Sequence, residues 1–310
     1  MGFGPEFCWA KSRNLANSHR LIDIVRGDSI LYTDLTDAEN TGGDFTFDSD
    51  GITWNGGGAN ANDSGKTFVL WSWLAGGTAA SNTDGSITSS VSASPTSGFS
   101  IVTYTGNSTA GATVGHGLGK KPTMIIVKNR DDGVQDWPVQ HGSIGATGQM
   151  VLSSTAANNA NIVYWNNTEP TSSVFSLGTA NNTNQSGDSH VAYVFTDIDG
   201  YSKAGSYVGN GSSDGPMIVT GFRPAWVMVK ASSSTGGWTI FNSDNSNFNL
   251  VDSDLSAEDS RAEVTGSTRG MDWLSNGFKL RSSFGSRNGS GVTYIYLAFA
   301  EQPFKYANAR

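Results

Sequence analysis

Large apolar side chains occupy every second position in three short segments of the chain. Val69, Trp71 and Trp73 show this spacing in the first segment, and it recurs at positions 191–195 and 295–299. A period of two is typical of a β-strand. The residues in between are also mostly apolar, as expected for a strand that is covered on both faces. We therefore predict a buried β-strand in each segment.

A second kind of segment also occurs three times. Each copy begins with proline, continues with a short apolar run and ends with lysine, at residues 5–11, 122–128 and 224–230. The β-branched and aromatic residues of these runs favour strand over helix. The gapless alignment predicts matching strand ends at Lys11, Lys128 and Lys230. It also predicts matching buried sites at Cys8, Ile125 and Val227, because a slip of one residue would turn the core face outward.

The two kinds of segment recur in the same order about every 100 residues, which indicates three diverged copies of a domain-sized module. The first module spans residues 1–74 and lacks the opening strand of the other two. The second spans residues 98–203 and the third residues 204–310. Residues 75–97, rich in Gly, Ser and Thr, form either a polar linker or a pair of strands. We predict an all-β fold of three tandem β-sandwich or jelly-roll-like modules, the first truncated at its N-terminus.

The truncated first module leads to a further expectation. An incomplete sheet leaves a row of unpaired backbone groups, which invites the addition of another strand. The segment after Phe299 resembles the start of another module, with Phe304–Tyr306 near the place of Tyr201–Lys203. We predict that this C-terminal segment closes the first sheet, either within one chain or between subunits.

Composition and charge narrow the classes of partner. The net charge is -8 and no basic run exists, whereas nucleic-acid binding needs clustered Lys and Arg. No apolar stretch approaches the roughly 20 residues of a spanning helix, so we expect no membrane insertion. No signal peptide is recognisable at the N-terminus. Charged residues make up only 15% of the chain, which predicts a surface of hydroxyls and amides.

The residues that could carry catalysis or bind a metal fit turns and cores better. Gly211–Gly215 matches the G-x-S-x-G pattern of a hydrolase nucleophile, but no helix is expected after it. Asp48–Gly51 and Asp197–Gly200 resemble pieces of a calcium loop, yet they lack the distal glutamate and suit β-turns. The four histidines show no metal-ligand spacing, and the single Cys8 allows no disulfide within the chain. We expect neither enzyme activity nor a metal or cofactor.

Aromatic residues are the remaining candidates for a binding surface, because their faces stack on sugar rings and also fill ordinary cores. Trp71 and Trp73 alternate within a predicted strand and therefore belong to a core. Trp137, Trp165 and Trp238 lie near polar loops. We predict that these three residues are exposed and bind a ligand.

Several distinctive motifs resemble repeat modules of tail-fibre and other virion structural proteins of marine bacteriophages. The motifs occupy residues 98–107, 115–119, 207–216 and 300–310. The resemblance implies a virion component at the extracellular surface with other virion proteins as partners. It carries over no catalytic residues.

We expect a tail fibre or adhesin that binds a polysaccharide of the host cell surface. One alternative is a capsid decoration protein or another virion subunit that binds no receptor. A second alternative is an enzyme that depolymerises surface polysaccharide. The strands around Tyr294 and Tyr296 are more apolar than a free monomer comfortably exposes, which predicts a homo-oligomer such as a trimer.

Overall fold

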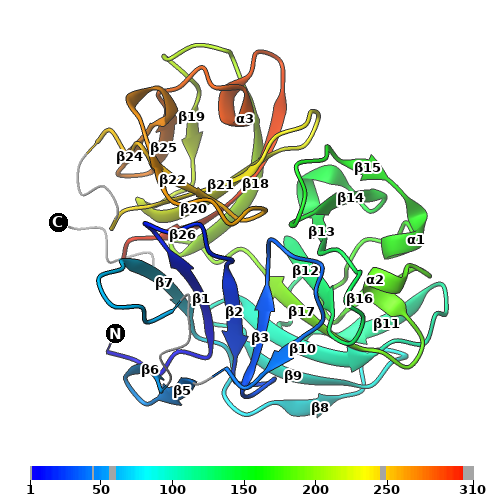
Figure 1. Cartoon of the computed structure of the whole chain (residues 1–310). Helices are drawn as coiled ribbons and strands as arrows, with labels where there is room; N and C mark the ends of the chain where they lie inside the picture. Colours follow the sequence, from blue (N-terminus) through cyan, green and yellow to red (C-terminus); the bar gives the residue numbers. More distant parts are fainter. Residues whose placement is uncertain (1, 44, 56–60, 245–248, 303–310) are drawn as a thin grey trace.

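The computed structural model describes residues 2–43, 45–55, 61–244 and 249–302. Antiparallel strands dominate these residues, and the predicted all-β fold is confirmed. Three main sheets, one in each module, lie around a common centre (Figure 1).

The sheet of the first module has the strand order β4-β3-β2-β1-β7. A separate hairpin, β5–β6, packs against its outer face. The bounds are β1 Phe7–Ser12, β2 Arg20–Asp23, β3 Ser29–Tyr32, β4 Asn40–Thr41, β5 Phe45–Asp48, β6 Gly51–Trp54 and β7 Phe68–Trp73.

The sheet of the second module has the order β15-β14-β13-β12-β17-β10-β9-β8, and the pair β11–β16 covers its outer face. The bounds are β8 Ala80–Asn82, β9 Ser89–Ser94, β10 Phe99–Thr105, β11 Ala112–Gly115, β12 Met124–Asn129, β13 Pro138–His141, β14 Gly148–Val151, β15 Asn159–Ala160, β16 Val174–Leu177 and β17 Ser189–Phe195. The short helices are η1 Gly142–Ile144, α1 Ile162–Trp165 and α2 Asn181–Asn184.

The sheet of the third module has the order β18-β26-β20-β21-β22-β23, and the sheet β19-β25-β24 covers its outer face. The bounds are β18 Ser202–Val208, β19 Met217–Val219, β20 Pro224–Ala231, β21 Trp238–Asn242, β22 Ser253–Ser256, β23 Val264–Thr265, β24 Met271–Leu274, β25 Gly277–Leu280 and β26 Thr293–Ala300. The short helices are η2 Ser267–Arg269 and α3 Gly285–Asn288.

The three sheets share one pairing register at their centres. The predicted lysine triplet lies opposite Val69, Val191 and Ile295 in the pairs β1–β7, β12–β17 and β20–β26. All three lysines are fully buried, as are Cys8, Ile125 and Val227. The prediction that these triplets occupy matching sites is therefore confirmed.

The inner faces of the three sheets meet in one hydrophobic core. Phe7 and Trp73 of the first module, Phe195 of the second and Trp226 and Phe299 of the third all belong to it. The ring centroids of Trp73 and Phe299 are 5.5 Å apart, and those of Phe195 and Phe299 are 6.0 Å apart. Because they share this core, the three modules pack together as one unit and are not independently folded domains on a string.

Equivalent backbone hydrogen bonds close the modules into a ring. In each module, the residue just before one end strand of the main sheet (β4, β15 or β23) donates its N–H to a neighbouring module. The accepting carbonyl lies two residues after the buried lysine. The three bonds are Glu39 N to Arg130 O at 2.7 Å, Asn158 N to Ser232 O at 2.9 Å and Glu263 N to Arg13 O at 2.7 Å. The first module thus contacts the second, the second the third, and the third the first.

Strand pairing assigns two segments near the expected module boundaries to particular sheets. Residues 75–97 contain β8 and β9, which extend the sheet of the second module beyond β10. β18 runs across the expected boundary between residues 203 and 204, because it pairs along its whole length with β26. The predicted closure of the first sheet by the C-terminal segment involves residues 303–310, which lie outside the described residues.

The apolar strand face that suggested an oligomer is covered by the chain itself. Tyr294 and Tyr296 are buried beneath β19, β25 and β24, where they contact residues such as Phe278. The expectation that this face is exposed in a single chain is wrong, because the sequence did not reveal which segment forms the second layer. The face therefore gives no support to a homo-oligomer.

Candidate ligand-binding groove

The three tryptophans predicted to be exposed are buried. Trp137 and Trp165 have no exposed surface, and Trp238 is 1% exposed. The prediction of an exposed recognition surface is therefore wrong. The polar loops beside these residues in sequence lie at the surface, but the indole rings point into the cores.

Trp137 and Trp238 join modules. Trp137 Nε1 donates to the carbonyl oxygens of Tyr32 at 3.0 Å and Leu35 at 3.1 Å, both in the first module. Trp238 Nε1 donates to the carbonyl oxygen of Val151 in the second module at 2.8 Å. An indole that fills a core and satisfies a carbonyl across a module boundary has a structural role.

The four histidines also serve the fold. All are buried, and burial lowers the pKa of His19 to about 3 and that of His141 to about 4. His141 Nδ1 accepts from the Ser143 N–H, so its Nε2 carries the proton and donates to the Tyr296 carbonyl at 3.1 Å. Neutral, enclosed imidazoles in such contacts act as packing groups.

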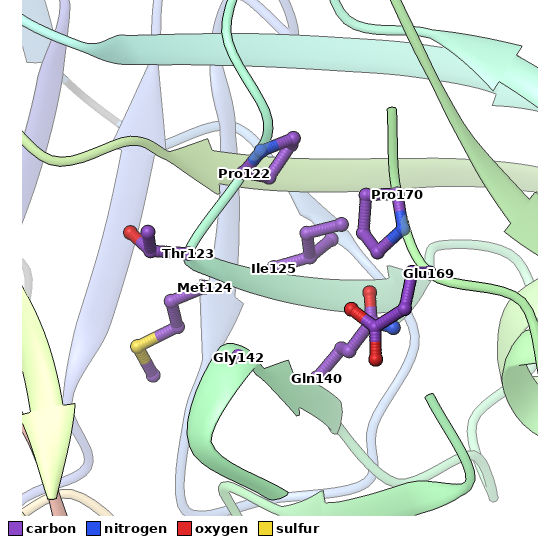
Figure 2. Close-up of a pocket in the computed structure, with 8 residues that line it drawn as sticks. All are labelled: Pro122, Thr123, Met124, Ile125, Gln140, Gly142, Glu169 and Pro170. Carbon is purple, nitrogen blue, oxygen red and sulfur yellow. The ribbon is translucent and has the colours of Figure 1, made fainter. Parts of the chain in front are cut away.

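One crevice lies at the start of β12 (Figure 2). Its lining residues are Pro122–Ile125, Gln140, Gly142, Glu169 and Pro170. Glu169 forms an exposed ion pair with Lys121 at 3.0 Å. The crevice is too narrow to admit a water molecule, so it offers no room for a ligand.

A wider groove crosses β8, β9 and β10 of the second module. Its volume is about 370 Å³, within the range of small-ligand sites. Its walls are mainly hydroxyl-bearing residues, namely Ser81, Thr88, Ser89, Ser90, Thr103, Tyr104, Thr105 and Ser189, together with Arg130. The groove is therefore polar and open to solvent.

The strand register aligns several of these hydroxyls across neighbouring strands. Ser81 lies opposite Ser90, Ser90 lies opposite Thr103, and Thr105 lies opposite Ser189. Within the described residues, the hydroxyl groups of Ser81, Ser90 and Thr103 have no hydrogen-bond partner. A hydroxyl both donates and accepts, so this row can bind a polyhydroxylated ligand from one side.

The hairpin β8–β9 builds the groove, and the turn between its strands anchors it. The Ile87 N–H donates to the Thr113 carbonyl on β11 at 3.0 Å. Ile87 and Val91 are each 8% exposed and pack into the core of the second module. Among the described residues the third module has no such hairpin, since β18 ends its sheet.

Arg130 is the charged residue of the groove lining. Its Nε and Nη2 donate to the two carboxylate oxygens of Glu39 at 2.8 and 2.6 Å. Glu39 also accepts from Arg26 Nη1 at 2.9 Å, and Arg26 is fully buried against Asp23. These contacts hold the guanidinium in one orientation at the boundary between the first and second modules.

The described residues lack two further features that would point to a function. They contain no group of three or more His, Cys, Asp or Glu side chains that could hold a metal ion. They also contain no helix that is long and apolar enough to span a membrane.

The sequence analysis did not predict this groove, because the expected binding surface consisted of tryptophans, whereas the groove is lined mainly by Ser and Thr. A usable signal was present: residues 75–97 are rich in Ser and Thr and interrupt the repeat. A polar insertion that pairs with an existing sheet edge adds a new surface to only one copy of a repeated module.

Comparison with known proteins places this all-β chain in a family. The family is described as a domain of unknown function (DUF7483), and its profile matches residues 1–303. The chain therefore belongs to this family. No curated protein and no solved structure matches it.

Proposed function

We propose that the protein is a bacteriophage virion component at the extracellular surface, acting as a tail fibre or adhesin that binds host-surface glycan. The observation that carries the binding role is the hydroxyl row of Ser81, Ser90 and Thr103 in an open groove. The virion assignment rests on the resemblance of the repeat motifs to phage tail-fibre modules. Other virion proteins and a host polysaccharide are the partners.

The chemistry of the groove suits a sugar better than an apolar ligand. Sugar hydroxyls exchange donor and acceptor roles with Ser and Thr hydroxyls, and both sides lose water on contact. Such contacts are individually weak. Several copies on one particle would strengthen attachment by a factor of about 10²–10⁴ when they engage the same surface.

A virion subunit that binds no receptor is the second candidate. The closed ring of three modules favours it, because one chain already has the approximate symmetry of a trimer. Such a body can occupy a threefold position of a particle and contribute stability there. The groove would then be a surface feature without a ligand.

The test combines glycan binding with a matched control. The variants Ser90→Ala and Thr103→Val remove groove hydroxyls, whereas Ser206→Ala changes the position of the third module that matches Thr103. Binding to host envelope polysaccharide should fall at least tenfold in the groove variants and stay unchanged in the control. Equal binding by all of these proteins would refute the groove as the site.

Three further measurements separate the candidate functions. Retention on host cells together with labelling at fibre tips supports the adhesin. Labelling over the capsid without retention supports the structural subunit. Release of sugar fragments supports a depolymerase. The solution mass of the purified protein tests the homo-oligomer.

A further inference from the structure

We infer that the groove selects an acidic glycan, and that Arg130 binds the anionic group of the sugar. This inference rests on the proposed function, since it names the class of glycan bound at the same groove. Its basis is the single charged side chain among the lining residues, set beside a row of neutral hydroxyls.

Arg130 retains donors for a ligand. A guanidinium has about five N–H groups, and Glu39 accepts from two of them, on Nε and Nη2. The remaining three, two on Nη1 and one on Nη2, have no acceptor within the described residues. Two nitrogens side by side suit the paired oxygens of a carboxylate or a sulfate.

In the ion pair between Arg130 and Glu39, the cation is more exposed to solvent than the carboxylate. The Arg130 side chain is 21% exposed and that of Glu39 is 10% exposed. Glu39 is further occupied by Arg26, and it does not line the groove. The nearby Asp131 is exposed, but it does not line the groove, and its Oδ2 accepts from the Ser189 backbone N–H at 2.6 Å.

The local charge contrasts with the whole chain. The net charge of -8 repels an anionic polymer in general. A groove with one guanidinium and no acidic lining residue is therefore a localised site for an anion. Because Arg130 is already oriented by Glu39, binding costs little side-chain entropy.

A second ion pair, between Arg13 and Glu263, provides a control for the pair between Arg130 and Glu39. Arg13 holds Glu263 through the same two nitrogens, at 3.0 and 2.8 Å, at the matching position of another module boundary. Arg13 does not line the groove. Arg13→Gln therefore breaks an equivalent ion pair without touching the proposed site.

The probes are polygalacturonate, alginate and dextran sulfate as acidic polymers, and galactan, mannan and dextran as neutral ones. Binding of the full chain should favour at least one acidic polymer by tenfold or more over its neutral counterpart, and it should weaken as salt is raised. Arg130→Gln should abolish that preference, whereas Arg13→Gln should retain it. Comparing dextran sulfate with the two uronates identifies the anionic group as sulfate or carboxylate.

The variant Glu39→Gln tests whether Arg130→Gln loses binding only because the ion pair at the module boundary is broken. This variant also breaks the ion pair but leaves Arg130 in the groove, so it should lower thermal stability and retain acidic binding within about threefold. A loss as large as that of Arg130→Gln would assign the effect to the module boundary and overturn the inference.

The remaining outcomes separate the inference from the function on which it rests. Neutral polymers bound as tightly as acidic ones, with sensitivity to Ser90→Ala, would overturn acidic selectivity and leave the proposed glycan binding intact. If the protein bound neither the polymers nor the host polysaccharide, both the acidic selectivity and the proposed glycan binding would be overturned.

Discussion

The ammonium group of Lys128 donates to the carbonyl oxygen of Thr36 at 2.7 Å, so a buried charge of the second module binds the backbone of the first. Lys230 repeats this contact across the next boundary, to Thr155 at 3.2 Å and Ala156 at 2.7 Å. Lys11 instead donates within its own module, to Ser12 and Leu15. Two of the three lysines thus form hydrogen bonds between neighbouring modules of the ring.

These lysines predict a rise in stability with mild alkali. Burial lowers the pKa of Lys11, Lys128 and Lys230 to about 8 from the ordinary value of 10.5. Above pH 8 the unfolded chain holds protons that the folded chain has released, so the free energy of unfolding increases with pH. Each lysine contributes on the order of 1.4 kcal/mol per pH unit.

Urea denaturation between about pH 7.5 and 9 measures this slope. The upper limit matters because burial raises the pKa of Cys8 to about 11, which gives the opposite slope above pH 9. Lys230→Met should show a shallower rise than the unmodified protein. Parallel curves for the two proteins would contradict the prediction.

Two histidines predict a loss of stability in mild acid. The pKa of His19 is lowered to about 3 by burial and by the charge of Lys11, and that of His141 to about 4 by burial. Below pH 6.5 the unfolded chain takes up protons that the folded chain refuses, so stability falls as the pH falls. Each histidine contributes about 1.4 kcal/mol per pH unit.

The histidine effect is checked with one substitution. His141→Gln keeps a donor for the Tyr296 carbonyl and cannot titrate. Thermal unfolding followed from pH 7 to about 5 should show a smaller decrease for this variant than for the unmodified protein. An identical decrease in both would exclude His141 as a contributor.

The indole N–H of Trp137 should contribute to the boundary between the first two modules. Trp137→Phe removes the donor to Tyr32 and Leu35, and leaving such carbonyls unsatisfied costs about 1–3 kcal/mol. Trp165 is the matched control, because it is equally buried and its Nε1 has no partner among the described residues. Chemical denaturation should show a larger loss for Trp137→Phe than for Trp165→Phe.

The repeat and the buried strands could be predicted from the sequence because they depend on local patterns. Lys11, Lys128 and Lys230 align without gaps, and a shared register follows from the period of the strands. The same patterns also predicted a buried Cys8, which is fully enclosed.

The ring could not be predicted, and the sequence marked the groove only as a polar insertion at residues 75–97, because both features depend on contacts between distant segments. Trp238 lies beside a polar loop in sequence, but its indole contacts Val151, 87 residues away. Tyr294 belongs to a strand with apolar residues on both faces, and only the fold shows that the same chain covers it. Periodicity indicates which residues are buried but not which partner buries them.

The groove should depend on the apolar anchor of its hairpin. Ile87 packs into the core of the second module, and Ile87→Ala should cost about 2 kcal/mol by leaving a cavity. It should also weaken glycan binding more than tenfold, because β8 and β9 would no longer hold Ser81 and Ser90 beside Thr103. The control is Val219→Ala on β19, which removes a 55% exposed side chain and should change neither quantity. Stability measured by urea denaturation and binding measured on host polysaccharide check both effects, and full binding by a destabilised Ile87→Ala protein would show that the ligand does not use the hairpin.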